Sequence, residues 1–348
     1  MFDKKMPDLK WSMMGIWNES IVVSRSDRKP EPRDYIYASE MGGAFIDRFL
    51  KMKGITPTNP PNMRSLRKFS AGHIWEWIIE LILRRAGILI ASEEHVDYQY
   101  KGLLRVAGRL DHLAGGKPDW DKAKSEMEDL HLPEVISGVV EDMINHFMNR
   151  YPNGLEIIIL EAKSVSSFMF ENYLKSGTAN PNHKLQLFHY LKSKNLPEGH
   201  MVYICKDDCR MIELGIFNPS SVEDDYKEDI KKMTDYFTKD IQPELEPLII
   251  FDEMTMKFNY NWKVAYSGYL TMLYGFAEQM EYQDIYSPLA SKWTRVFKRV
   301  VNGDKMTALN LEVIEETKKV FPDYDKYVDL AKLKTKQGLI VEGEDEEI

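Results

Sequence analysis

Cysteine is scarce in this sequence, with only Cys205 and Cys209 among 348 residues. Two thiols on either side of the short segment KDD exclude a disulfide framework and favour a reducing compartment. No second cysteine pair exists that would complete a four-thiolate metal site. We therefore interpret both residues as ordinary buried or half-buried thiols.

Long apolar runs are also lacking. No run approaches the roughly 20 residues that a membrane span needs. The first residues, MFDKKMPDLKWSMMG, contain no continuous apolar core of the kind that a signal peptide carries. We therefore expect a cytoplasmic protein that does not bind membranes.

An excess of positive charge is absent, because the net charge is −9. This value argues against a protein that coats nucleic acid through bulk attraction. The C-terminal segment VEGEDEEI holds five acidic residues, so residues 1–340 carry a net charge of only −4. Such a tail is typical of a solvated, disordered segment, and a local basic groove stays compatible with the overall charge.

What the sequence does contain is typical of a soluble globular protein, with 43% hydrophobic and 29% charged residues. The pattern indicates an α/β core between two largely helical additions, without internal repeats. The predicted parts are an N-terminal helical or extended arm (1–65), the core (66–217), a C-terminal helical region (218–335) and an acidic disordered tail (336–348).

Within the core, the segment GHIWEWIIELILRRAG predicts a largely buried helix that ends at Gly87. The strand-like segments GILIASEE, HVDYQYKG and LLRVAGRLDHLAGG follow, and the last two predict a hairpin. A charged helical insertion is expected at about 118–150. The buried strand LEIIILEAKS comes next, then helices near 166–176 and 182–194, and a strand pair in MVYICK and MIELGIF.

Charged residues are expected where two of these strands end. Asp111 ends a strand shortly after a glycine that permits close backbone approach. Glu161 and Lys163 point to the same side of the next strand, because they are two residues apart. Neighbouring strands lie about 4.8 Å apart, so both carboxylates can reach one divalent cation such as Mg²⁺, which prefers oxygen ligands. The ammonium group of Lys163 would orient water or neutralise charge on a phosphate.

These motifs resemble those of the PD-(D/E)XK nuclease superfamily, most closely its RecB-like and lambda-exonuclease-like branch. Members of that branch add an upstream helix with glycine followed four residues later by Glu or His, as Gly72 and Glu76 are here. They also have a downstream helix with Gln-x-x-x-Tyr, matched by Gln186 and Tyr190. The four motifs occur in the family's order across roughly residues 69–217.

The resemblance implies a restriction-endonuclease-like core, a mixed central sheet flanked by helices, with one or two Mg²⁺ or Mn²⁺ ions. Lys163 would assist the attacking water, and Gln186 and Tyr190 would position Lys163 or contact the scissile strand. The implied metal ligands are Glu76, Asp111, Glu161 and the backbone carbonyl oxygen of Ala162.

The sequence departs from the family in two places. The interval of 50 residues between Asp111 and Glu161 is longer than usual, which is the reason to expect the helical insertion. Some relatives hold an iron–sulfur cluster through one early and three late cysteines. The corresponding segments here, MGGAF and NWKVAYSGY, contain none, so we expect no cluster.

Alternative interpretations stay open for several residues. His73 lies one turn from Glu76 and is either a metal ligand or a structural histidine. The apolar neighbours of Glu76 predict that it is buried, where an unpaired carboxylate is costly, and Glu80 is the substitute ligand. Basic residues form either a DNA-binding groove or ordinary solvated faces, namely Arg64, Arg67, Lys68, Lys292, Arg295 and Arg299.

The function implied by the resemblance is that of a metal-dependent deoxyribonuclease, an exonuclease that processes DNA ends in recombination, repair or phage replication. The alternatives are a structure-specific or sequence-specific endonuclease of the same superfamily and an inactive, nuclease-fold DNA-binding scaffold. DNA is the implied partner, together with a recombination or replication protein or further copies of the chain. The implied setting is the cytoplasm of a bacterium or of a phage-infected host.

Overall fold

The computed structural model describes residues 13–24, 30–129, 140–216, 220–253, 255–275 and 282–336. The chain divides into two compact units. The first comprises Met1–Thr56 and Pro60–Pro243, and the second comprises Pro57–Asn59 and Glu244–Ile348.

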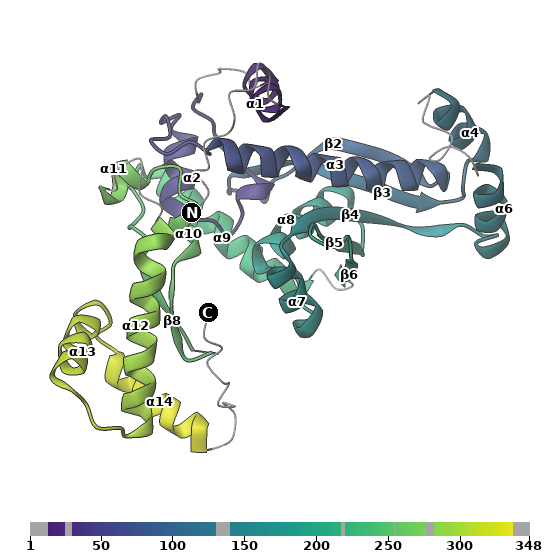
Figure 1. The fold of residues 1–348 in the computed structure, drawn as a ribbon. Helices are drawn as coiled ribbons and strands as arrows, with labels where there is room; N and C mark the ends of the chain where they lie inside the picture. The colour runs from purple at the N-terminus through teal and green to yellow at the C-terminus, as the bar shows by residue number, and fades with distance from the viewer. Residues whose placement is uncertain are drawn as a thin grey trace. The chain divides into compact units, whose positions relative to one another are not determined.

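The first unit contains a mixed sheet with helices on both sides (Figure 1). Its helices are α1 (Met13–Ser24), the 3-10 helix η1 (Ala38–Glu40), α2 (Phe45–Met52), α3 (Met63–Arg85), α4 (Trp120–Asp129), α6 (Val140–Arg150), α7 (Ser167–Ser176), α8 (Pro181–Lys194) and α9 (Ser220–Thr238). Its strands are β1 (Tyr35–Tyr37), β2 (Leu89–Tyr98), β3 (Arg105–Gly116), β4 (Leu155–Val165), β5 (Gly199–Cys205) and β6 (Met211–Ile216).

The strand order is β1-β3-β4-β5-β6, and β2 pairs with β3 as well. The pairs β1–β3 and β4–β5 are parallel, whereas β2–β3, β3–β4 and β5–β6 are antiparallel. The prediction of an α/β fold with a mixed central sheet flanked by helices is therefore confirmed. The predicted hairpin is also present as β2 and β3, although GILIASEE and HVDYQYKG form one strand rather than two.

Alternating residues of β4 face two different helices. Leu160 and Ala162 pack with Ile79 of α3 in a buried apolar cluster. The side chain of Glu161, between them in sequence, bonds instead to Gln186 of α8. Because successive side chains of a strand point to opposite faces, α3 and α8 cover opposite sides of β4 at this position.

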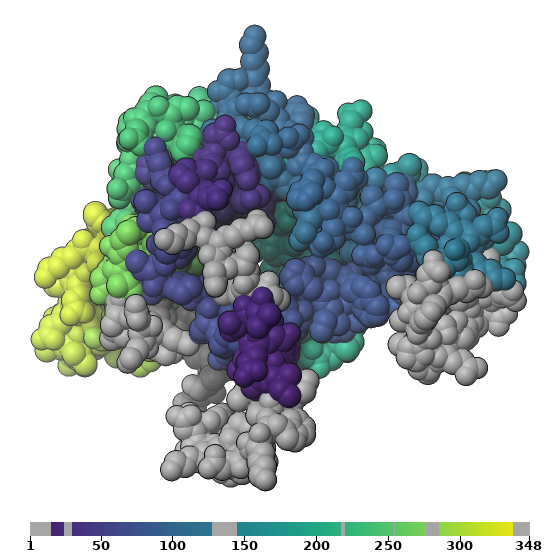
Figure 2. Space-filling model, turned by 90° about the horizontal axis from the view of Figure 1, so that it is seen from above, coloured from purple at the N-terminus to yellow at the C-terminus, as the bar shows by residue number. Residues whose placement is uncertain are grey.

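The helical insertion lies at the far end of the long strands β3 and β4 (Figure 1). In the space-filling view, α4 and α6 form a projection from the blue and teal body of the first unit (Figure 2). Both described helices fall within the predicted insertion at 118–150. Residues 130–139 of the insertion lie outside the described residues.

Helix α9 belongs to the first unit, although the sequence placed it with the C-terminal region. Arg48 of α2 is 2% exposed, and its guanidinium forms two hydrogen bonds of 2.6 and 2.9 Å with the carboxylate of Asp229 in α9. Tyr226, also on α9, is buried, and its hydroxyl group forms a 2.8 Å hydrogen bond with Nδ1 of His189 in α8. These long-range contacts hold α9 against the core, and no local sequence pattern predicts them.

The second unit contains a two-stranded sheet, in a region that the sequence analysis predicted to be helical. Helix α12 packs on it through Trp293 and Phe297. Its elements are β7 (Ile249–Asp252), β8 (Lys257–Tyr260), α10 (Trp262–Ala265), α11 (Leu270–Tyr274), α12 (Tyr282–Asn302), α13 (Ala308–Val320) and α14 (Tyr324–Lys336). The predicted acidic tail at 336–348 lies outside the described residues from 337 onward.

Among the helices that the structure describes, none combines the length and the apolar character that crossing a bilayer requires.

Candidate active site

A buried carboxylate lies at the centre of the candidate site. Glu161 of β4 is 0% exposed. Its Oε1 atom accepts hydrogen bonds from Nζ of Lys163 at 2.5 Å and from Nε2 of Gln186 at 2.7 Å. Its Oε2 atom is buried without a hydrogen-bond partner among the described residues. Since burying a polar oxygen without a partner is costly, this atom is the strongest local sign of a cation-binding site.

Asp111 provides a second carboxylate beside Glu161. The ladder between β3 and β4 pairs His112 with Leu160 and does not extend to Asp111. Next to the end of this ladder, the backbone N–H of Ala162 donates a hydrogen bond to Oδ2 of Asp111 at 2.9 Å. The aspartate thus takes the place of a strand carbonyl, which fixes its side chain at the edge of β4. Asp111 lies inside β3 (Arg105–Gly116) and not at its end, so the predicted position at a strand end was wrong.

Helix α8 supplies the polar wall opposite β4. Nε2 of Gln186 also donates to the hydroxyl of Tyr190 at 3.0 Å, as expected for residues one helical turn apart. Tyr190 in turn packs on Gly108 of β3, where a Cβ atom would lie only 2.7 Å from its Cε1 atom. The close backbone approach that the sequence assigned to this glycine is therefore present.

The electrostatics of the site depend on its burial. Burial raises the pKa of Glu161, the charge of Lys163 opposes this shift, and the negative charges of Asp111 and Glu76 add to it. Burial alone would lower the pKa of Lys163, but the carboxylates of Glu161, Asp111 and Glu76 outweigh it and raise that pKa. Lys163 therefore stays a cation beside these carboxylates.

The oxygen atoms of this site provide some of the ligands that a hard divalent cation needs. Asp111 and Glu161 offer carboxylate oxygens, one of them buried and unpaired, and Mg²⁺ is commonly held by one or two carboxylates with several waters. Among the described residues, however, no group of three or more His, Cys, Asp or Glu side chains gathers at metal-binding distance. Two of the three predicted side-chain ligands are thus brought together.

Glu76, the third predicted ligand, bonds to a neighbour on its own helix. Its Oε2 atom lies 2.9 Å from Nδ1 of His73, and its side chain is 29% exposed. Ile74 and Trp77, whose apolar character led us to expect burial, are 54% and 46% exposed. The expectation of a buried Glu76 and of a largely buried helix is therefore wrong. Its metal ligation and that of the Ala162 carbonyl stay predictions.

The predicted DNA-binding residues are distributed over both units. In α3, Arg64 and Lys68 are exposed, whereas Nη1 of Arg67 donates to Asn18 of α1 at 2.7 Å. In α12 of the second unit, Lys292 and Arg295 are exposed. Arg299 of that helix is half-buried, and its Nη2 atom donates to the carbonyl of Lys305 at 3.1 Å. Their contact with DNA stays a prediction.

Sequence reasoning missed two residues beside Lys163. Tyr203 of β5 is paired with Lys163 in the parallel ladder, and its hydroxyl lies 2.9 Å from Nδ1 of His183 in α8. Burial and the charge of Lys163 lower the pKa of His183 to about 3. The spacing His183, Gln186, Tyr190 places all three on one helical face, and this periodicity was the available signal.

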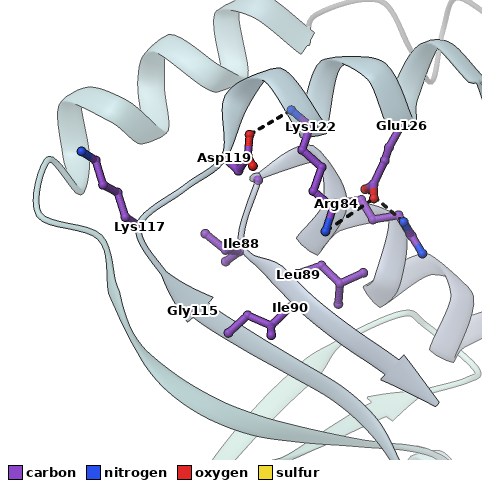
Figure 3. Close-up of a pocket in the computed structure, with 11 residues that line it drawn as sticks. Arg84, Ile88, Leu89, Ile90, Gly115, Lys117, Asp119, Lys122 and Glu126 are labelled. Atoms are coloured by element: carbon purple, nitrogen blue, oxygen red, sulfur yellow. Dashed lines mark hydrogen bonds and ion pairs between the residues drawn. The ribbon is translucent and has the colours of Figure 1, made fainter. Parts of the chain in front are cut away.

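A pocket of about 230 Å³ lies elsewhere, at the end of α3 (Figure 3). In it, Arg84 forms ion pairs of 2.7 Å with Glu80 and 3.0 Å with Glu126, so the guanidinium is already neutralised. The N–H of Asp119 donates to the carbonyl of Gly87 at 2.9 Å. These contacts connect the start of α4 to the end of α3, and the pocket is best explained as the junction of the insertion.

Comparison with known proteins gives only distant similarity. No family model and no curated protein matches the chain. The crystal structure of SSO0001 has a TM-score of 0.38 and 15% identity, covering 65% of this chain and 88% of that protein. An alkaline exonuclease (LHK-Exo) from Laribacter hongkongensis has a TM-score of 0.36 and 12% identity, covering 60% and 90%. Its complex with dAMP has a TM-score of 0.37 at the same identity and coverage. These values are too low to assign a family.

Proposed function

We propose that the chain is a metal-dependent phosphodiesterase that hydrolyses DNA, and specifically an exonuclease that processes DNA ends. The observation that carries the proposal is the buried, unpaired Oε2 atom of Glu161, next to Asp111 and Lys163. A carboxylate pair with an adjacent ammonium group is suited to phosphoryl chemistry, where negative charge must be neutralised. The four sequence motifs resemble those of lambda-exonuclease-like nucleases, and this resemblance is the reason to propose DNA ends as the substrate.

Each side chain has a defined role in this proposal. A divalent cation held by Asp111 and Glu161 would supply Lewis acidity toward a phosphate oxygen. Lys163 keeps its proton because the neighbouring carboxylates raise its pKa. Its ammonium group can therefore hold the attacking water or balance charge that develops on the phosphate. Gln186 holds the Oε1 atom of Glu161, which leaves Oε2 available for the cation.

The test is cleavage of end-labelled linear duplex DNA and single-stranded DNA beside a closed circular DNA, with Mg²⁺, Mn²⁺ or EDTA. The variant Lys163→Ala removes the ammonium group. Lys239→Ala is the matched control, because Lys239 is 60% exposed and, in the described part of the chain, forms its ion pair with Asp235 one turn away. We expect metal-dependent loss of the linear substrates with the wild type and the control, and no loss with Lys163→Ala.

The other outcomes separate the alternatives. Cleavage of the circle would replace the exonuclease with an endonuclease of the same chemistry. If the wild type cut no substrate and still bound DNA, a nuclease-fold scaffold would replace the enzyme. Glu161→Ala adds a second check, because an enzyme would lose cleavage while keeping DNA binding.

A further inference from the structure

The two ring nitrogens of His183 differ in their hydrogen bonding within the described part of the chain. Its Nδ1 atom lies 2.9 Å from the hydroxyl oxygen of Tyr203. Among the described residues, no hydrogen-bond partner is found for its Nε2 atom. The imidazole is partly exposed, and it is close enough to Lys163 for that charge to disfavour a second proton on the ring.

The hydrogen bonds around Tyr203 determine which nitrogen carries the proton. Tyr203 is 0% exposed, and its hydroxyl oxygen accepts the backbone N–H of Asn180 at 3.1 Å. A buried hydroxyl proton needs an acceptor, and Nδ1 of His183 is the acceptor in reach. Because burial raises the pKa of Tyr203, the hydroxyl keeps its proton at all ordinary pH values. Tyr203 therefore donates to Nδ1, and the proton of the neutral imidazole is on Nε2.

The ring is held in a fixed position. Tyr203 stacks on Tyr173 of α7, with ring centroids 4.2 Å apart and an angle of 24° between the planes. His183 lies on the same face of α8 as Gln186, which bonds to Glu161. The neutral Nε2–H donor thus belongs to a ring whose other nitrogen is bonded to Tyr203, the ladder partner of Lys163.

We propose that His183 is a further substrate-binding residue, whose Nε2–H group donates a hydrogen bond to a phosphate oxygen of the nucleic acid strand next to Lys163. The inference rests on the proposed function, since it requires a phosphodiester at this site. A neutral donor adds a hydrogen bond without adding a second cation next to the ammonium group. Burial and the charge of Lys163 lower the pKa of His183 to about 3, so this donor is neutral at neutral pH.

Two substitutions separate this role from a structural one. His183→Asn places an amide near the Nδ1 position, which can still bond to Tyr203, but removes the Nε2 donor. His183→Gln places an amide N–H near the Nε2 position and removes the Nδ1 acceptor. A hydrogen bond to a charged group contributes enough that kcat/KM of His183→Asn should fall roughly 10- to 100-fold. His183→Gln should recover most of that loss.

The assay is cleavage of an end-labelled single-stranded oligonucleotide with Mg²⁺, with kcat and KM measured separately and folding checked by circular dichroism. Wild-type activity in His183→Asn, or a larger loss in His183→Gln than in His183→Asn, would overturn the inference and leave the proposed function intact. An inactive wild type would overturn the proposed function itself.

A measurement on the wild type covers the case in which both variants fail to fold. In protein with ¹⁵N-labelled histidine, one imidazole beside Lys163 should keep Nε2 protonated from neutral pH down to about pH 4. Its signal should shift when the oligonucleotide is added in EDTA. His189, whose pKa burial also lowers, is the internal control that should not respond. The absence of any shift in the His183 signal would overturn the inference.

Discussion

Replacing Gly108 by alanine tests the close contact between β3 and α8 on which the site depends. A Cβ atom at this position would lie 2.7 Å from Cε1 of Tyr190 and 2.9 Å from Cβ of Ala38. Optimal separations between carbon atoms are about 3.5–4.0 Å. The backbone φ of Gly108 is not positive, so alanine brings no backbone strain, and the lower entropy of the unfolded chain favours folding by about 0.4–1 kcal/mol.

We expect the steric clash at Gly108→Ala to outweigh this entropic gain. Overpacking of this kind costs about 1–3 kcal/mol, and the middle of the two ranges leaves a net destabilisation of about 1.3 kcal/mol. For a unit of this size, the unfolding midpoint should fall by roughly 3–5 °C. Displacement of Tyr190 would also disturb Gln186 and its bond to Glu161. We therefore expect DNA cleavage at a temperature well below the midpoint to decrease as well.

The matched control is the same substitution at Gly72 in α3. There a Cβ atom would meet only Oγ of Ser164, at 3.7 Å, which is ordinary van der Waals contact. Alanine inside a helix is favoured over glycine by about 0.5–1 kcal/mol, so the midpoint should rise by roughly 1–4 °C. Thermal unfolding by circular dichroism gives both values. If Gly108→Ala were as stable and as active as the wild type, the packing argument for Tyr190 would be refuted.

Three further predictions concern other parts of the first unit. Arg48→Met should lower the free energy of unfolding, measured with urea, by about 3–5 kcal/mol, because it leaves the Asp229 carboxylate without its buried partner. The double variant Arg48→Met/Asp229→Leu should lose less stability than the single variant. His189 is buried with its pKa lowered to about 4, below its unfolded value of about 6.5, so the unfolded chain binds more protons between these values. Stability should therefore fall as the pH decreases from 6.5 to 4, and less so in His189→Gln; an equal slope would contradict the assignment. Mg²⁺ or Mn²⁺ should raise the unfolding midpoint with increasing concentration, and this rise should vanish in Glu161→Gln. An unchanged rise in that variant would place the cation elsewhere.

The local sequence was sufficient for the order of elements in the core. Alternating or continuous apolar runs predicted β3 and β4, because strand periodicity depends only on neighbouring residues. The same locality predicted that Glu161 and Lys163 lie on one side of β4 and that Gln186 and Tyr190 lie on one face of α8. Contacts within three or four residues require no knowledge of the rest of the chain.

Tertiary structure decided what those side chains meet. The ladder between β3 and β4 stops before Asp111, so its carboxylate binds the N–H of Ala162, and strand register is not readable from composition. Glu76 lies on a helix face that is partly exposed, because burial depends on which elements cover the helix. The predicted helical region also contains β7 and β8, since tertiary packing overrides weak local propensity.

The environment of His183 shows the same division. Its spacing from Gln186 is present in the sequence, but its tautomer follows from a hydrogen bond to Tyr203, 20 residues away on another element. Sequence determined which chemical groups the chain carries and which of them share a strand or a helix face. Only the folded structure determined which oxygen of Glu161 is left unpaired and which nitrogen of His183 carries its proton, because both depend on partners brought together across the sheet.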